Sequence, residues 1–141
     1  MVNVKVKKLN PEAIIPSYAH ENDAGMDIYS IEDKTILPGE RELISTGISM
    51  EIPEGYVALV WDKSGLAAKQ GLKTMGGVIE HTYRGEYKII LFNSSNQEIT
   101  ILKNQKIAQI LIQPIVSARL QEVDELSDTE RGSKGFGSSG L

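Results

Sequence analysis

The sequence predicts a single all-β domain, either a sandwich, a jelly roll or a barrel. About eight short runs rich in β-branched or aromatic residues precede residue 115, as is typical of these architectures. Turn-forming residues separate the runs, as at Asn93–Asn96. A chain of 141 residues is long enough to bury a sizeable core in one domain.

Two patterns identify the strands. Val2, Val4 and Val6 alternate with polar residues, which predicts a strand with one buried face. The same alternation predicts a strand at residues 48–52, and the continuous apolar run Tyr56–Trp61 predicts another. Three further runs of strand-forming residues span 87–92, 99–102 and 107–112.

Only one segment resembles a helix. Ser64 is a suitable N-cap, residues 66–70 are good helix formers, and Gly71 fits the left-handed position that closes a helix. The predicted helix is barely two turns long.

The composition changes after Ser127, where residues 128–140 contain four glycines and little that a core could bury. We therefore expect a domain over residues 1–126 and a flexible arm over residues 127–141. Most such tails are inert, but Arg131 can bind phosphate oxygens and Phe136 can lie flat against a ligand. A cation and a planar ring on a mobile arm are typical of a nucleotide lid.

Charge and residue usage exclude several classes of function. The 15 Lys and Arg against 19 Asp and Glu give a net charge of −4, which disfavours a nucleic-acid polymer as partner. The absence of cysteine excludes disulfides and thiolate chemistry, and two histidines exclude a histidine-rich metal centre. No run of 18 apolar residues and no signal-peptide core are present, so the expected location is cytoplasmic and no membrane partner is expected.

Further candidate site residues lie between the strands. The Ser64 hydroxyl, the Lys63 charge and the first N–H groups of the helix can converge on an anion, although Ser64 can equally be only a cap. Residues 76–86 predict a hairpin with Glu80 and Tyr83 near its tip. A carboxylate there can orient or deprotonate a water beside a phosphate ester, whereas Tyr83 is more often a packing residue.

The order and spacing of these segments resemble the homotrimeric all-β dUTPases. Five segments correspond in turn to the motifs of that family: Ala24–Ser30, Lys63–Lys69, Gly77–Gly85, Ile107–Ile110 and Arg131–Gly140. The resemblance implies a jelly-roll-like β-barrel of the dUTPase β-clip type and a homotrimer with shared active sites. It also implies Mg²⁺-assisted hydrolysis of dUTP to dUMP and pyrophosphate, which limits uracil in DNA and supplies dUMP for dTMP synthesis.

The resemblance also implies a role for individual residues. Glu80, Asp27 and Arg131 are the expected catalytic residues, with Glu80 orienting water and Asp27 near the hydration shell of the metal, which the phosphates and water mainly hold. The backbone at Gly77 reads uracil, and Tyr83 stacks beneath the deoxyribose. The remaining expected substrate contacts are Lys63, Ser64, Gly65, Lys88 and Gln109 in the body and Arg131, Phe136, Gly137, Ser138 and Ser139 in the arm.

The sequence departs from the family pattern at three motifs. Glu80 stands where Asp is usual, and its extra methylene moves the charge by roughly 1 Å. Asp62 and Lys63 replace Pro-Arg, so a point charge replaces a bidentate cation. The fourth motif is preceded by Asn104–Lys106 instead of Gly-Asp-Arg, and Thr82 stands where a second acidic residue is common.

Two alternative functions share this fold. A dCTP deaminase requires a glutamate in the strand after the hairpin, where this chain has Leu91. A non-catalytic dUTP-binding or regulatory protein is suggested by the departures at Glu80 and Lys63. The complete arm favours the hydrolase over this second alternative, because closure over a triphosphate serves a reaction.

Overall fold

The computed structural model describes residues 1–140 and confirms the all-β prediction, with twelve strands and one helix in that range. The strands are β1 (Lys5–Lys8), β2 (Ser17–Tyr18), β3 (Met26–Tyr29), β4 (Lys34–Ile36), β5 (Arg41–Ser45), β6 (Ile48–Glu51), β7 (Tyr56–Trp61), β8 (Leu72–Met75), β9 (Val78–Ile79), β10 (Lys88–Asn93), β11 (Ile99–Ile101) and β12 (Lys106–Pro114). The helix α1 spans Ser64–Gln70.

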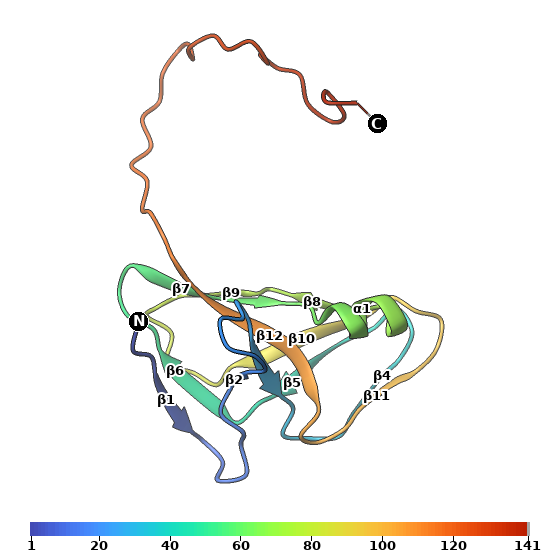
Figure 1. The fold of residues 1–141 in the computed structure, drawn as a ribbon. Helices are drawn as coiled ribbons and strands as arrows, with labels where there is room; N and C mark the ends of the chain where they lie inside the picture. The colour runs from blue at the N-terminus through green and yellow to red at the C-terminus, as the bar shows by residue number, and fades with distance from the viewer. Residues whose placement is uncertain (141) are drawn as a thin grey trace.

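All strand pairs are antiparallel, and they form four small sheets around one interior (Figure 1). The largest sheet has the order β2-β3-β12-β7-β9, and a second has the order β5-β10-β8. The pairs β1-β6 and β4-β11 lie at opposite sides of the body in Figure 1. Neighbours in the two larger sheets are mostly distant in the sequence, so the chain crosses repeatedly between sheets.

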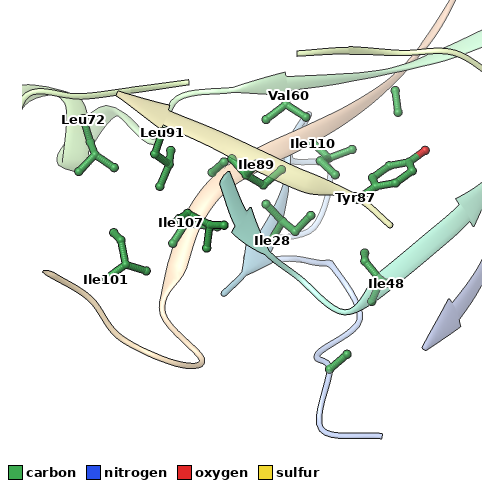
Figure 2. Close-up of a cluster of buried hydrophobic side chains, with 14 of the residues drawn as sticks. Ile28, Ile48, Val60, Leu72, Tyr87, Ile89, Leu91, Ile101, Ile107 and Ile110 are labelled. Atoms are coloured by element: carbon green, nitrogen blue, oxygen red, sulfur yellow. The ribbon is translucent and has the colours of Figure 1, made fainter. Parts of the chain in front are cut away.

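The core consists of side chains that alternate inward along the strands. On β10, Ile89 and Leu91 are almost fully buried while Lys88 is exposed, as the period of two in a strand requires. Figure 2 shows these residues meeting aliphatic side chains from β3, β6, β7, β8, β11 and β12. Residues from most of the sheets therefore share one apolar interior.

The strand predictions are confirmed in position and corrected in extent. The first strand begins at Lys5 instead of Val2, whose side chain is exposed. The last strand runs on to Pro114 because it pairs with β7 along its C-terminal half. The number of strands exceeds the predicted eight because segments such as β2 and β9 have only two residues, too few to give a periodic pattern.

The helix is confirmed, but the prediction that Ser64 is its N-cap is wrong. Lys63 holds the cap position with an extended backbone, Ser64 is already helical, and no side chain caps the first turn. Gly71 closes the helix with a φ of 70°, as predicted. Within residues 1–140, no helix has the length and apolar character needed to cross a membrane.

The C-terminal segment leaves the body after β12. Residues 115–140 are exposed and contain neither helix nor strand, and Figure 1 shows them arching away from the sheets. The predicted arm, residues 127–141, lies within this segment except for Leu141, which is outside the described residues.

Candidate active site

Asp27, Gln109 and Trp61 form a row across three strands of the largest sheet. Gln109 on β12 lies opposite Asp27 on β3 and opposite Trp61 on β7. Opposed residues in antiparallel strands project to the same face, and the flanking residues Ile28 and Ile110 are buried in the core. The row therefore lies on the face of the sheet that points away from the core.

Asp27 is held between two lysines. Its side chain is 7% exposed, with Lys63 at one carboxylate oxygen and Lys106 at 2.8 Å from the other. Burial alone would raise the pKa of Asp27, but the hydrogen bonds from Lys106 and Lys63 outweigh it and hold the pKa below its usual range. We call these three residues the Asp27 cluster, which carries one excess positive charge.

A cleft of about 480 Å³ adjoins this row and is named the Gln109 cleft. Gln109 donates to the backbone oxygen of Asp62 at 2.8 Å, which fixes its amide group. A Cβ at Gly25 would lie 2.2 Å from Oε1 of Gln109, so glycine permits this close approach. The lining residues are Ala24, Gly25, Trp61, Asp62, Ser64, Ala67, Gln109 and Leu111.

Asp62 lines this cleft, but its carboxylate is occupied by β8. One oxygen accepts hydrogen bonds from the backbone N–H and the hydroxyl of Thr74, each at 2.6 Å, and the other lies 3.0 Å from Lys73. Burial opposes ionisation, but these contacts lower the pKa of Asp62. Its negative charge is thus compensated by Lys73 and Thr74, which reduces its repulsion of an anion bound in the cleft.

A second cleft of about 560 Å³ surrounds the segment between β8 and β10 and is named the Tyr83 cleft. Within it, Tyr83 closes a turn by donating its N–H to the backbone oxygen of Glu80, and its hydroxyl donates to the backbone oxygen of Glu86, each at 3.0 Å. A Cβ at Gly85 would lie 2.3 Å from the Tyr83 hydroxyl. Tyr83 is therefore fixed although 46% of its side chain is exposed.

The hairpin predicted at residues 76–86 is partly wrong. The chain does reverse there, since β8 and β10 pair with each other, but the short strand β9 pairs with β7. Val60 donates its N–H to the Gly77 oxygen at 2.8 Å, and a Cβ at Gly77 would lie 2.5 Å from the Val60 oxygen. Glycine is therefore required where the segment crosses to the other sheet, a long-range contact that local periodicity does not reveal.

Tyr87 is a residue of this cleft that sequence reasoning treated only as part of a strand. It is 1% exposed, and its ring centroid lies 6.1 Å from that of Tyr83. Burial raises the pKa of Tyr87 to about 12, and its hydroxyl has no hydrogen-bond partner among residues 1–140. The sequence signal that could have identified it is a tyrosine two residues before the inward-facing Ile89, which predicts a buried ring.

The predicted site residues lie in several separate places. Glu80, Tyr83 and Lys88 line the Tyr83 cleft, whereas Ser64 and Gln109 line the Gln109 cleft beside the Asp27 cluster, and the two clefts share no lining residue. Gly77 lies at the β7–β9 crossing, and Gly65 lies in the first turn of α1. Exposed positions of the arm carry Arg131, Phe136, Gly137, Ser138 and Ser139.

The donor atoms near the Gln109 cleft suit a hard cation only in part. Within residues 1–140, no group of three or more His, Cys, Asp or Glu side chains is arranged to hold a metal ion. Asp27 offers carboxylate oxygens, the ligand type that Mg²⁺ prefers, and Mg²⁺ commonly combines one or two carboxylates with phosphates and water.

The chain is similar to known proteins over nearly its whole length. The sequence profile of the dUTPase family matches residues 11–140. A deoxyuridine 5'-triphosphate nucleotidohydrolase of Clostridioides difficile is 51% identical over the full length of both chains. Another from Nautilia profundicola is 50% identical over 99% of each chain.

Solved structures of similar fold are also dUTPases. The dUTPase of Staphylococcus bacteriophage 80alpha, solved with dUpNHpp, superposes with a TM-score of 0.92 at 33% identity and covers 100% of both chains. A variant dUTPase of S. aureus phage phi11, described with a structural Mg(II) ion, gives a TM-score of 0.83 at 28% identity, covering 90% of this chain and all of the phage chain. The family match spans nearly all of the sequence and both clefts, and the chain therefore belongs to the dUTPase family.

Proposed function

We propose that this chain hydrolyses dUTP to dUMP and pyrophosphate in a homotrimer whose sites combine residues of different chains. The observation that carries the proposal is the separation of two clefts on one chain, one of them beside the two lysines of Asp27, with an arm that lines neither cleft. The Gln109 cleft adjoins an excess of positive charge, which suits a triphosphate. The Tyr83 cleft is lined largely by apolar and backbone groups, which suits a flat base and a sugar.

The phosphates bind at the Gln109 cleft. The Ser64 hydroxyl and the Gln109 amide line it, and the Lys63 ammonium, paired with Asp27, comes from the residue before Ser64. No atom lies within 4 Å of where a Cβ at Gly65 would stand, so a phosphate can approach the backbone there. Lys63 supplies a point charge and no bidentate fork, which makes this contact sensitive to salt.

Uracil and deoxyribose bind at the Tyr83 cleft. The backbone near Gly77 reads the polar edge of the base and leaves no room for a methyl or an amino group. The Tyr83 ring, held by Glu86 and Gly85, packs beneath the sugar and excludes a 2′-hydroxyl. Lys88 lines the same cleft and adds a positive charge at its rim.

Glu80 orients the attacking water. Its side chain is exposed at the turn before Tyr83 and forms no ion pair within residues 1–140, so its carboxylate can accept a proton from water. The water oxygen forms a bond to the α-phosphorus as the bond to the leaving pyrophosphate breaks, with no covalent enzyme intermediate. When bound, Mg²⁺ would neutralise charge on the phosphates, and Asp27, the nearest carboxylate to the Gln109 cleft apart from Asp62, would lie near its hydration shell.

The arm closes the site of another chain. Arg131, Ser138 and Ser139 bind the γ-phosphate end, while Phe136, fully exposed in one chain, covers the base with Gly137 beside it. Exposed apolar residues before the arm, including Val116, Leu120 and Leu126, offer surface for a neighbouring copy to bury. Ending the chain after Leu126 should abolish turnover and leave the trimer and its melting temperature nearly unchanged. A truncated protein with full activity would exclude the arm from the site.

The test is pyrophosphate release from dUTP, dCTP, dTTP and UTP, with Mg²⁺ and with a chelator, for the wild type beside Glu80→Ala and Glu80→Asp. We expect metal-dependent release from dUTP alone, lost in Glu80→Ala and kept or increased in Glu80→Asp. Saturable dUTP binding with no release would instead indicate a binding protein. Release of ammonia from dCTP would indicate a deaminase, which Leu91 disfavours because it lies 1% exposed within the apolar core.

A further inference from the structure

The Asp27 cluster contains a cation to which the reaction as derived above gives no role. Lys63 and Lys106 contact different oxygens of Asp27, and Lys106 lies at the first position of β12 with 48% of its side chain exposed. Lys63 is needed at the phosphates, yet in the free chain it is engaged by Asp27. Binding of the triphosphate therefore requires Lys63 to exchange one anion for another.

This exchange leaves a nearly buried carboxylate. The Asp27 side chain is only 7% exposed, so water cannot replace a departing ammonium fully. An ion pair broken on one side leaves an uncompensated charge that is strongly unfavourable in such a site. The exchange is feasible only where a second cation remains on Asp27.

Lys106 meets this requirement. Its Nζ lies 2.8 Å from Oδ2 of Asp27, whereas Lys63 binds Oδ1, so Lys63 can depart without disturbing the Lys106 contact. We propose that Lys106 is a positioning residue that compensates the charge of Asp27 and thereby releases Lys63 to the substrate phosphates. This inference rests on the proposed phosphate role of Lys63.

Glu51 is a second carboxylate with two cations, but we expect no such dependence on either of them. Glu51 has Lys5 at 3.0 Å and Arg84 at 3.7 Å, but its side chain is 44% exposed. Water can solvate Glu51 when either cation leaves, so neither cation is required there. Lys5→Met therefore serves as the matched control for Lys106→Met.

The experiment is a double-mutant cycle with purified full-length protein: wild type, Lys63→Met, Lys106→Met and the double variant, with Lys106→Arg and Lys5→Met beside them. KM and kcat for dUTP are measured, together with the melting temperature and the oligomeric state of each variant. We expect Lys106→Met to raise KM about tenfold with a smaller change in kcat, Lys106→Arg to restore KM, and Lys5→Met to change neither.

The double variant decides the mechanism. Once Lys63 is absent, no exchange occurs at Asp27, so adding Lys106→Met should raise KM much less than it does in the wild type. Equal effects in both backgrounds, or an unchanged KM in Lys106→Met, would overturn the inference. An unchanged KM in Lys63→Met would overturn the phosphate role of Lys63 and this inference with it. Should Lys106→Met fail to fold, Lys106→Gln takes its place with the same expected direction.

Discussion

The two clefts of this chain are shaped by different forces. The Gln109 cleft adjoins fixed polar groups: two lysines on the nearly buried Asp27 carboxylate and an amide held by a backbone oxygen. The Tyr83 cleft is defined by packing, with an aromatic ring resting on Gly85 and a second ring behind it. We therefore expect charge to govern affinity at the first cleft and shape to govern selectivity at the second.

Close contacts that require glycine occur in or beside both clefts, but each glycine contacts a different kind of neighbour. A Cβ at Gly25 would meet the flexible end of Gln109, one at Gly85 would meet the Tyr83 ring, and one at Gly77 would meet a backbone oxygen. A side-chain end moves at low cost, a pinned ring moves less easily, and a backbone group in a strand pair moves least. This order predicts the size of the effects of substitution.

Gly77→Ala should have the largest effect. The added methyl would lie 2.5 Å from the Val60 oxygen and would force β7 and β9 apart, lowering the free energy of unfolding by about 1–3 kcal/mol. Denaturant unfolding measures the loss of stability, and kcat/KM for dUTP measures the effect on activity. Gly65→Ala, with open space at its Cβ, is the control for stability and should unfold no more easily than the wild type.

Gly85→Ala and Gly25→Ala should separate selectivity from affinity. Moving the Tyr83 ring should raise the kcat/KM for UTP relative to dUTP about tenfold, whereas moving Gln109 should raise KM for dUTP and leave that ratio unchanged. The ratio is measured by pyrophosphate release from each nucleotide. Equal ratios in the two variants would show that the clefts do not divide these tasks.

Asp62 joins the Gln109 cleft to β8, and its ionisation should make the fold sensitive to acid. Its backbone oxygen holds Gln109, and its carboxylate holds Thr74 on β8. Because folding lowers the pKa of Asp62, its contribution is present above the unfolded pKa, about 4, and is lost as pH falls through the folded pKa. Asp62→Asn should unfold about 1 kcal/mol more easily at pH 7, and the difference from the wild type should shrink below pH ~4. A difference independent of pH would contradict this account.

Tyr87→Phe should have the smallest effect. Removing a buried hydroxyl usually destabilises a protein by losing a hydrogen bond, but the Tyr87 hydroxyl has no partner within residues 1–140. The variant keeps the ring behind Tyr83, so its selectivity for dUTP should not change. Its melting temperature should equal or exceed that of the wild type, and its free energy of unfolding should be higher by up to about 1 kcal/mol. A lower melting temperature would show that the assembled protein supplies a partner for this hydroxyl.

Sequence patterns were enough to predict the all-β class, the main strands, the helix closed by Gly71 and the set of family motifs. These features depend on local patterns: alternation along a strand, a run of helix formers and a glycine with positive φ. Ser64 shows the limit of such patterns, because cap position depends on the backbone of Lys63, one residue earlier.

The contacts between residues distant in the sequence emerge from the folded structure. Sheet topology brings together four contacts between residues from different segments. They are the pairing of β9 with β7, the two lysines on Asp27, the hydrogen bonds of Asp62 with Thr74, and the ring of Tyr87 behind that of Tyr83. Sequence periodicity reports the face of a strand but not its neighbour, since strand order is set by burial of one shared core. The charge balance at Asp27 and the shape of the Tyr83 cleft are therefore properties of the folded chain alone.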